Sequence, residues 1–342
     1  MRDTVDVAVV GAGLAGCAAA SVLTAQDHAV TVYEQGPPGK DKPCGDAFLP
    51  DAVEHLRAVG VDLEADPPPG ARRFDQVGLW AGGRRLWRTS AGAGPGWVAP
   101  RAAVDQRLRD AVAARGCTIH HDHRVVAVNR TGDHRWTVEV AGRPPVEVDA
   151  VVLAVGAHGR LLRQVGIGLD APIARSLSVY VEGSTTTSAD FHFGATPFTG
   201  YAWEFPLSGG RGNVGVCSVT DGTAALRPAL ERFVSEHGLR PAGRPRGGTG
   251  PLWVGTQRRW HHEGGAVTCG DAAGLVDALT GEGIGAALRS GLSAGRALAD
   301  HADGVPGALA GYSVSLAADT ASRLAPSPAR RVWEHLARMP GG

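Results

Sequence analysis

The residues best suited to chemistry stand near the amino end, where Gly11, Gly13 and Gly16 form a GxGxxG sequence. An apolar run at 7–10 precedes them, an alanine-rich stretch follows, and Glu34 comes after a second apolar run. This order predicts a strand, a tight turn, a helix and a strand. The glycines would let a pyrophosphate approach the helix start, and Glu34 would accept hydrogen bonds from a ribose. The stretch therefore predicts a dinucleotide site. The alternative is a glycine-rich turn in another kind of α/β protein.

A second glycine-rich segment lies near the carboxyl end. A short strand at 267–269 is followed by Gly270 and Asp271, and alternating glycines from Gly281 open a long helix of small residues. Amide groups and the positive dipole end at such a helix start suit an electron-rich group. Two glycine-rich helix starts suit an extended cofactor, whose pyrophosphate would lie at one helix start and whose redox ring would lie at the other.

Between these segments, strand patterns rich in aromatic residues predict an antiparallel sheet over 171–260. In GYAWEFP, the period of two puts Tyr201, Trp203 and Phe205 on one face. This aromatic stripe either lines a substrate cavity or packs against the protein's own helices. A loop rich in Gly and Pro carries Cys44 toward the cofactor, unless this thiol is only a small buried side chain.

The composition of the chain excludes several classes of function. Its 342 residues suffice for two domains or one large interleaved fold. Acidic and basic residues balance at 34 each, which argues against nucleic acid as a partner. Five scattered cysteines without a CxxC pair argue against disulfides and zinc, and favour a reducing, cytoplasmic setting. Because acidic residues precede the first apolar run and glycines break it, no targeting or transmembrane segment is expected.

A histidine-rich segment at 117–128 is expected to form one strand. His120, His121 and His123 would then point alternately to opposite faces, and no other ligand cluster accompanies them, so no metal site is expected. Upstream, Arg101 begins a predicted helix and is placed to reach a phosphate or a ribose.

Several motifs in order carry a family resemblance. They are GAGLAG with Glu34, KPCGDAFLPDAVEHL, PRAAVDQRL, VVLAVGA, GYAWEFP and CGDAAGLVDALTGEGIGAALRSG. Together they resemble the FAD-dependent oxidoreductases with the p-hydroxybenzoate-hydroxylase-like fold, and most closely the geranylgeranyl reductase family. The resemblance implies an α/β fold in which a Rossmann-type FAD-binding domain is interleaved with an antiparallel-sheet substrate domain. We expect the FAD-binding domain at 1–72, 98–170 and 260–330, the substrate domain at 73–97 and 171–259, and a C-terminal helix or tail at 331–342.

The resemblance also implies roles for individual residues. GYAWEFP is similar to the family's YxWxFP motif, a wall between flavin and substrate, so Tyr201, Trp203 and Phe205 are expected to bind substrate. Cys44, Tyr201 and Trp203 are the expected catalytic residues, and Cys44, Tyr201 or water would supply a proton. The expected cofactor-binding residues are Gly11, Ala12, Gly13, Leu14, Ala15, Gly16, Glu34, Gln35, Cys44, Gly45, Asp46, Arg101, Val125, Ala154, Gly156, Gly270, Asp271, Gly281, Gly283 and Ile284.

The function implied by the resemblance is reduction of C=C bonds in a hydrophobic, isoprenoid-type substrate by hydride from reduced FAD. NAD(P)H or a reduced protein carrier, such as a reductase or ferredoxin, would supply electrons.

The sequence departs from the family pattern at two places. Val155 and Gly156 stand where many relatives carry an Asp-Gly pair, and Ala278 replaces a common proline. The alternatives are a monooxygenase or halogenase-like enzyme acting on an aromatic or natural-product substrate, and a lycopene-cyclase-like flavoprotein without net redox change. The chain lacks the WxWxIP motif of halogenases.

Overall fold

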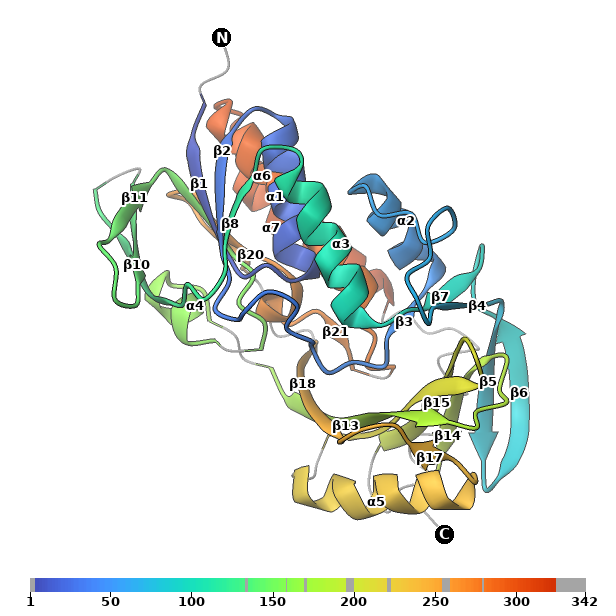
Figure 1. The fold of residues 1–342 in the computed structure, drawn as a ribbon. Coiled ribbons are helices and arrows are strands. Elements are labelled where there is room, and N and C mark those ends of the chain that lie inside the picture. The colour runs from blue at the N-terminus through green and yellow to red at the C-terminus, as the bar shows by residue number, and fades with distance from the viewer. Residues whose placement is uncertain are drawn as a thin grey trace.

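The fold is that of a computed structural model, which describes residues 4–132, 135–157, 159–168, 171–194, 200–219, 223–253, 259–278 and 280–323. The predicted C-terminal helix or tail at 331–342 lies outside these residues. Two layers of sheet, each with its own helices, make up the described part of the chain (Figure 1).

A mainly parallel sheet forms the first layer, with strand order β19-β20-β12-β1-β2-β8. In β1, Val7 and Val9 pack on one face, and Ala8 and Val10 pack on the other. Both faces are therefore buried, as expected of a parallel sheet. Its strands are β1 (Asp6–Val10), β2 (Ala29–Tyr33), β8 (Thr118–His120), β12 (Ala150–Leu153), β19 (His261–His262) and β20 (Ala266–Thr268).

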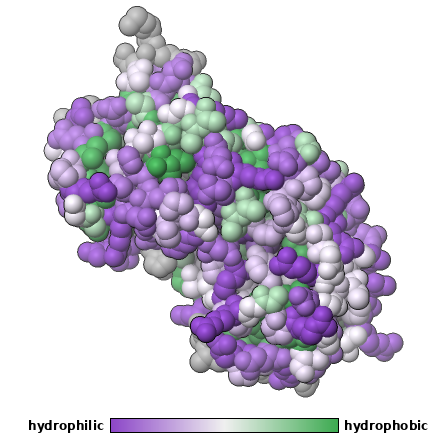
Figure 2. Space-filling model, in the orientation of Figure 1, coloured by the Kyte–Doolittle hydropathy of each residue, from purple (hydrophilic) through white to green (hydrophobic). Residues whose placement is uncertain are grey.

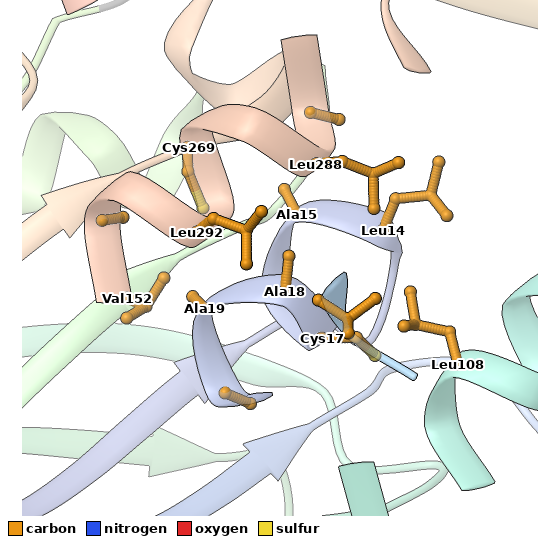
Figure 3. Packing of buried hydrophobic residues seen from close by; sticks show 14 of the residues in the cluster. Leu14, Ala15, Cys17, Ala18, Ala19, Leu108, Val152, Cys269, Leu288 and Leu292 are labelled. Atoms are coloured by element: carbon orange, nitrogen blue, oxygen red, sulfur yellow. The ribbon is translucent and has the colours of Figure 1, made fainter. Parts of the chain in front are cut away.

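Helices of small residues cover one face of this sheet, where α1 and α6 pack closely (Figure 3). A Cβ added at Gly291 of α6 would lie 2.2 Å from the Ala15 carbonyl oxygen, and one at Gly295 would lie 2.7 Å from that of Ala19. The alanine-rich sequence of α1 and the glycines of α6 therefore form one close contact. The helices are α1 (Leu14–Ala25), α3 (Arg101–Ala113), α6 (Ile284–Ala302) and α7 (Ala308–Arg323), and a short 3-10 helix (Gly270–Ala273) follows β20.

The opposite face of the parallel sheet is covered by a small antiparallel sheet and a short helix. These elements are β9 (Val125–Arg130), β10 (Trp136–Val140), β11 (Val146–Val148) and α4 (Arg160–Gln164). The prediction of a single strand over 117–128 is wrong, because β8 ends at His120 and β9 belongs to a different sheet. Asp122 adopts a φ of 55° between them, a left-handed conformation that Asp tolerates and that turns the chain.

The second layer is a mainly antiparallel sheet with the strand order β21-β18-β13-β16-β15-β14-β5-β6, in which β17 also pairs with β13. Along β15, Ala202 packs toward α5 (Thr223–Glu236), whereas Tyr201, Trp203 and Phe205 face the other way. The predicted α/β fold, with a parallel sheet and a separate antiparallel sheet, is confirmed. The strands are β5 (Gln76–Ala81), β6 (Arg84–Ser90), β13 (Ile173–Glu182), β14 (Ala189–Phe193), β15 (Gly200–Leu207), β16 (Arg211–Ser218), β17 (Arg240–Pro241), β18 (Arg246–Trp253) and β21 (Val276–Asp277).

A second small sheet lies near the junction of the layers and packs with α2 (Pro50–Ala58). Its strands are β3 (Ala47–Phe48), β4 (Arg72–Phe74) and β7 (Gly96–Val98). Figure 2 shows that the outer surface on this side is largely hydrophilic, with hydrophobic residues in small separate patches. Within the described ranges, no helix combines the length and the apolar character needed to cross a bilayer.

Candidate active site

A cavity of about 700 Å³ lies between the two layers. Its walls come from the start of α1, the loop before β3, the inner face of the antiparallel sheet and the segment before α6. It thus brings together the two glycine-rich segments and the aromatic stripe. The predicted site residues that line it are Gly13, Leu14, Ala15, Cys44, Gly45, Asp46, Arg101, Ala154, Gly156, Tyr201, Trp203, Phe205, Gly270, Asp271, Gly281, Gly283 and Ile284.

The glycines of the first turn have different steric roles. A Cβ added at Gly11, where φ is 108°, would lie 2.4 Å from the Ala154 carbonyl oxygen. One added at Gly16 would lie 1.9 Å from the Gly11 carbonyl oxygen. One added at Gly13 would meet nothing within 4 Å, and Gly13 caps α1 without a side chain. The open helix start therefore fits the pyrophosphate of a dinucleotide such as FAD.

Glu34 follows β2 and its carboxylate contacts the same turn. One oxygen accepts a hydrogen bond from the backbone N–H of Ala12 at 2.9 Å, and the other accepts one from Gly36 at 2.8 Å. Glu34 thus holds the glycine turn in place, and its contact with a ribose stays a prediction. The other predicted residues outside the cavity lining are Gly11, Ala12, Gly16, Gln35, and Val125 at the buried start of β9.

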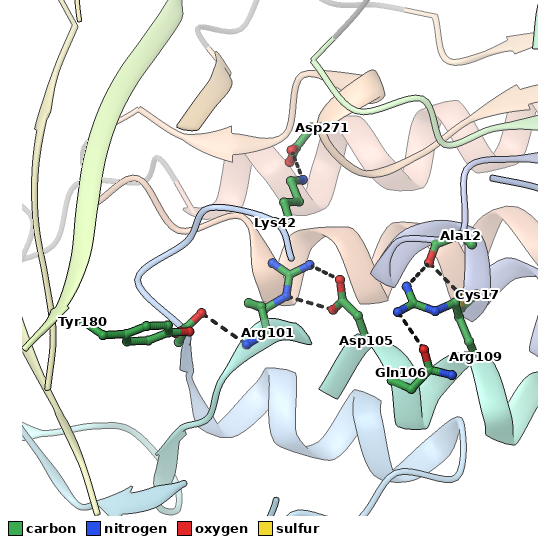
Figure 4. A network of polar contacts seen from close by, with 10 residues as sticks. Ala12, Cys17, Lys42, Arg101, Asp105, Gln106, Arg109, Tyr180 and Asp271 are labelled. Atoms are coloured by element: carbon green, nitrogen blue, oxygen red, sulfur yellow. Dashed lines mark hydrogen bonds and ion pairs between the residues drawn. The ribbon is translucent and has the colours of Figure 1, made fainter. Parts of the chain in front are cut away.

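Two ion pairs involve side chains that line the cavity (Figure 4). The ammonium of Lys42 lies 2.8 Å from the carboxylate of Asp271, which raises the pKa of Lys42. The guanidinium of Arg101 donates to both oxygens of Asp105 at 2.9 and 3.1 Å. Burial, the largest single effect, lowers the pKa of Arg101, but the contacts with Asp105 and Cys44 together outweigh it, so the pKa is raised.

Lys42 and Asp105 were missed by sequence reasoning, although each carries a signal. Lys42 is one of only two lysines in the chain and stands two positions before Cys44. Asp105 stands four positions after Arg101 in a helix, the spacing at which opposite charges meet.

The aromatic stripe lines the cavity from the antiparallel sheet. The hydroxyl of Tyr201 donates to the backbone carbonyl of Thr280, in the turn that precedes α6. A Cβ added at Gly281, where φ is 66°, would lie 2.7 Å from this hydroxyl. The glycine therefore allows the second glycine-rich segment to approach the stripe closely. Burial raises the pKa of Tyr201 well above its ordinary value.

The loop that carries Cys44 faces the stripe. Burial raises the pKa of the Cys44 thiol, so the thiol is protonated at neutral pH. Asp46 is fully buried with a φ of 64°, and burial raises its pKa to about 6. Its carboxylate accepts hydrogen bonds from the Tyr180 hydroxyl at 2.7 Å and the Asn213 amide at 2.8 Å. Sequence reasoning missed both partners, although the period of two along β16 places Asn213 on the same face as the stripe.

The fold and the cavity define a flavoprotein of the Rossmann type, and comparison with known proteins agrees. The model of the family described as "FAD binding domain" matches residues 4–229, so this part of the chain is an FAD-binding domain. The chain is 30% identical over 317 residues to menaquinone reductase of Mycobacterium tuberculosis, covering 84% of this chain and 75% of that protein. It is 26% identical over 313 residues to digeranylgeranylglycerophospholipid reductase of Thermoplasma acidophilum, covering 85% and 77%. More narrowly, the chain belongs to the FAD-dependent oxidoreductases of the geranylgeranyl reductase family, as the motifs indicated.

Solved structures with this fold include more than one kind of flavoenzyme. A geranylgeranyl bacteriochlorophyll reductase-like protein of Thermoplasma acidophilum superposes with a TM-score of 0.82 at 21% identity, covering 99% of this chain and 89% of that one. PqsL of Pseudomonas aeruginosa, described as a probable FAD-dependent monooxygenase, has a TM-score of 0.74 at 19% identity, covering 94% and 93%. The fold is therefore common to reductases and monooxygenases, and the residues of the site must distinguish them.

Proposed function

We propose that this protein is a reductase that saturates C=C bonds of a hydrophobic, isoprenoid-type substrate. The observation that carries the proposal is the apolar wall of the cavity beside the protonated thiol of Cys44. Away from the glycine turns, the wall contains Leu49, Val77, Phe191 and the aromatic stripe. Such a surface favours an extended apolar ligand over a polar one.

The residues of this chain have separate roles in the proposed reaction. Bound FAD would supply a hydride to one carbon of the double bond. Cys44 holds a proton for the other carbon, because burial keeps its thiol protonated. Tyr201 is less suited to this role, since its hydroxyl already donates to the Thr280 carbonyl. Trp203 and Phe205 form the wall that orients the substrate and excludes water.

The cofactor would lie between the two glycine-rich segments. Backbone amides at the start of α1 would bind the pyrophosphate, and the start of α6 would face the flavin. Asp271 would bind the ribitol or pyrophosphate region and exchange its Lys42 partner for cofactor hydroxyls. Arg101 is held by Asp105 at the same end of the cavity.

The test is turnover by the FAD-loaded protein, reduced with dithionite without oxygen and offered a digeranylgeranyl glycerophospholipid, or menaquinone whose quinol is reoxidised to the quinone before analysis. Product mass spectrometry is expected to show a gain of two hydrogens for each reduced bond. A gain of one oxygen in air would instead support the monooxygenase alternative. An unchanged mass with a new retention time would support isomerisation, and recovery of every substrate unchanged would contradict the proposal.

The electron donor is proposed to be NAD(P)H docking transiently or a reduced protein carrier. Because Val155 and Gly156 replace the Asp-Gly pair of many relatives, we favour the protein carrier. Mixing the oxidised, FAD-loaded protein with NADPH without oxygen tests this preference. Slow bleaching of the flavin is expected, whereas rapid bleaching would show that no carrier is required.

A further inference from the structure

Asn213 is a buried amide at the centre of β16 and has no exposed surface. Its neighbours on the adjacent strands are Phe205 and Tyr180. A buried amide destabilises the fold unless its donors and acceptor are satisfied. The Asn213 NH2 group donates to the Cys44 carbonyl and to the Asp46 carboxylate, both at 2.8 Å. Its oxygen accepts from the indole N–H of Trp203 at 3.0 Å.

Two glycines make this arrangement possible by allowing close approach. A Cβ added at Gly215 would lie 2.1 Å from Cζ2 of Trp203, so the indole lies directly over this glycine. A Cβ added at Gly45 would lie 2.8 Å from Cε2 of Phe205 and 3.3 Å from Nε1 of Trp203. The loop that carries Cys44 thus packs against the edge of the stripe, and Asn213 joins the two by hydrogen bonds.

We propose that Asn213 is a positioning residue that fixes the Trp203 indole and the Cys44 loop relative to each other in the wall of the cavity. Trp203 and Cys44 are the wall and the proton donor of the proposed function. Asn213 would thereby set the distance between them and determine which substrates fit. This consequence for substrates depends on the proposed function, but the positioning itself does not.

The surroundings of Asp46 add a pH dependence to this arrangement. Besides Asn213, Asp46 accepts from the Tyr180 hydroxyl and from the backbone N–H of Arg101 at 3.3 Å. The Arg101 guanidinium is paired with Asp105, and Arg211 and Arg246 lie over the ring of Tyr180 at 5.9 and 4.6 Å. Cys44 and Lys42 are the other titratable groups of this loop that line the cavity, and Lys42 is paired with Asp271. Replacing Asn213 by Asp would place two carboxylates within contact, which is tolerated only where one is protonated.

The first test measures Cys44 alkylation by iodoacetamide in the FAD-loaded protein, followed by peptide mass spectrometry, and needs no substrate. Asn213→Ala is expected to raise the rate about tenfold, because the loop loses its anchor. Tyr180→Phe is the matched control, since it removes a different hydrogen bond to Asp46 and should change the rate less than twofold. A rate in Asn213→Ala within twofold of wild type would overturn the proposal.

The second test uses Asn213→Asp, which keeps the side-chain volume and serves if the alanine variant does not fold. Its Cys44 alkylation is measured at pH 5 and pH 8, each relative to wild type at the same pH. The ratio is expected to be near one at pH 5 and to rise severalfold at pH 8, where both carboxylates ionise. A ratio that is equal at the two pH values would contradict positioning through these hydrogen bonds.

A double-mutant cycle between Asn213→Ser and Trp203→Phe separates positioning from general packing. Because Trp203→Phe removes the indole N–H, the two changes should be coupled at least threefold in the unfolding equilibrium constant. Tyr180→Phe with Trp203→Phe is the control cycle and should show clearly weaker coupling, because Tyr180 reaches Trp203 only through Asp46 and Asn213. Equal coupling in both cycles would overturn the proposal. Failure of the reductase assay alone, with these results intact, would count only against the proposed function.

Discussion

At the scale of single residues, Asp46 makes stability depend on pH. Burial raises its pKa from 3.8 to about 6. Because the folded protein binds this proton more tightly than the unfolded chain, the stabilising contribution is complete below about pH 4. This contribution is lost as the pH rises through about 6, and the free energy of unfolding falls by up to about 3 kcal/mol.

Urea unfolding between pH 4.5 and pH 7 tests this dependence. The free energy of unfolding of wild type, relative to Asp46→Asn, is expected to fall by about 2 kcal/mol across this range. Asp46→Asn has no carboxyl at this position, so its free energy of unfolding lacks this dependence on pH. Glu231 is exposed on α5, so Glu231→Gln is a control that should keep the wild-type slope. Parallel curves for wild type and Asp46→Asn would show that Asp46 does not titrate in this range.

The thiol of Cys44 supports a second prediction at the residue scale. Cys44→Ser should lower the rate of substrate reduction about 100-fold, because a hydroxyl is a much weaker acid than a thiol. FAD affinity should stay within threefold of wild type. Cys217 also lines the cavity and is half-buried, so Cys217→Ser is the matched control and should keep most of the activity. Equal rates in the two variants would assign the proton to another group.

At the scale of elements, the contact between α1 and α6 depends on the absence of side chains. The Cβ of Gly291→Ala would lie 2.2 Å from the Ala15 carbonyl oxygen, so the helices must separate. We expect a loss of roughly 2 kcal/mol in the free energy of unfolding, although Ala favours helices. Gly311 of α7 has no atom within 4 Å of an added Cβ. Gly311→Ala is therefore the control and should stabilise by about 0.5–1 kcal/mol in denaturant unfolding.

The elements differ in how well the sequence predicts them. The GxGxxG turn and the aromatic stripe were predictable, because local spacing determines which face each residue occupies. The break between β8 and β9 was not, since it depends on Asp122 adopting a left-handed conformation within a run of strand-forming residues. Asn213 was also missed, because its role depends on a loop distant in sequence that packs on its strand. Periodicity gives the face of a residue, but the residue's partner across the cavity comes only from the tertiary structure.

At the scale of the whole molecule, the cavity joins both layers, so a ligand that fills it should stabilise them together. FAD at 100 times its dissociation constant would add about 2.7 kcal/mol to the free energy of unfolding. Thermal unfolding of the cofactor-free protein should therefore shift upward as a single transition when FAD is added. A shift confined to one of two transitions would show that the layers unfold separately.

Gly13 and Gly16 of the first turn separate the effect of FAD binding from the stability of the fold itself. Gly13→Ala adds a Cβ where no atom lies within 4 Å, so cofactor-free stability should stay within about 0.5 kcal/mol of wild type. The same Cβ would occupy space proposed for the pyrophosphate and should weaken FAD binding at least tenfold, or about 1.4 kcal/mol. Gly16→Ala adds a Cβ 1.9 Å from the Gly11 carbonyl oxygen and should destabilise by about 1–3 kcal/mol with or without FAD. Calorimetric titration and thermal unfolding of both variants distinguish these effects, and wild-type FAD affinity in Gly13→Ala would mean that the cofactor does not contact this turn.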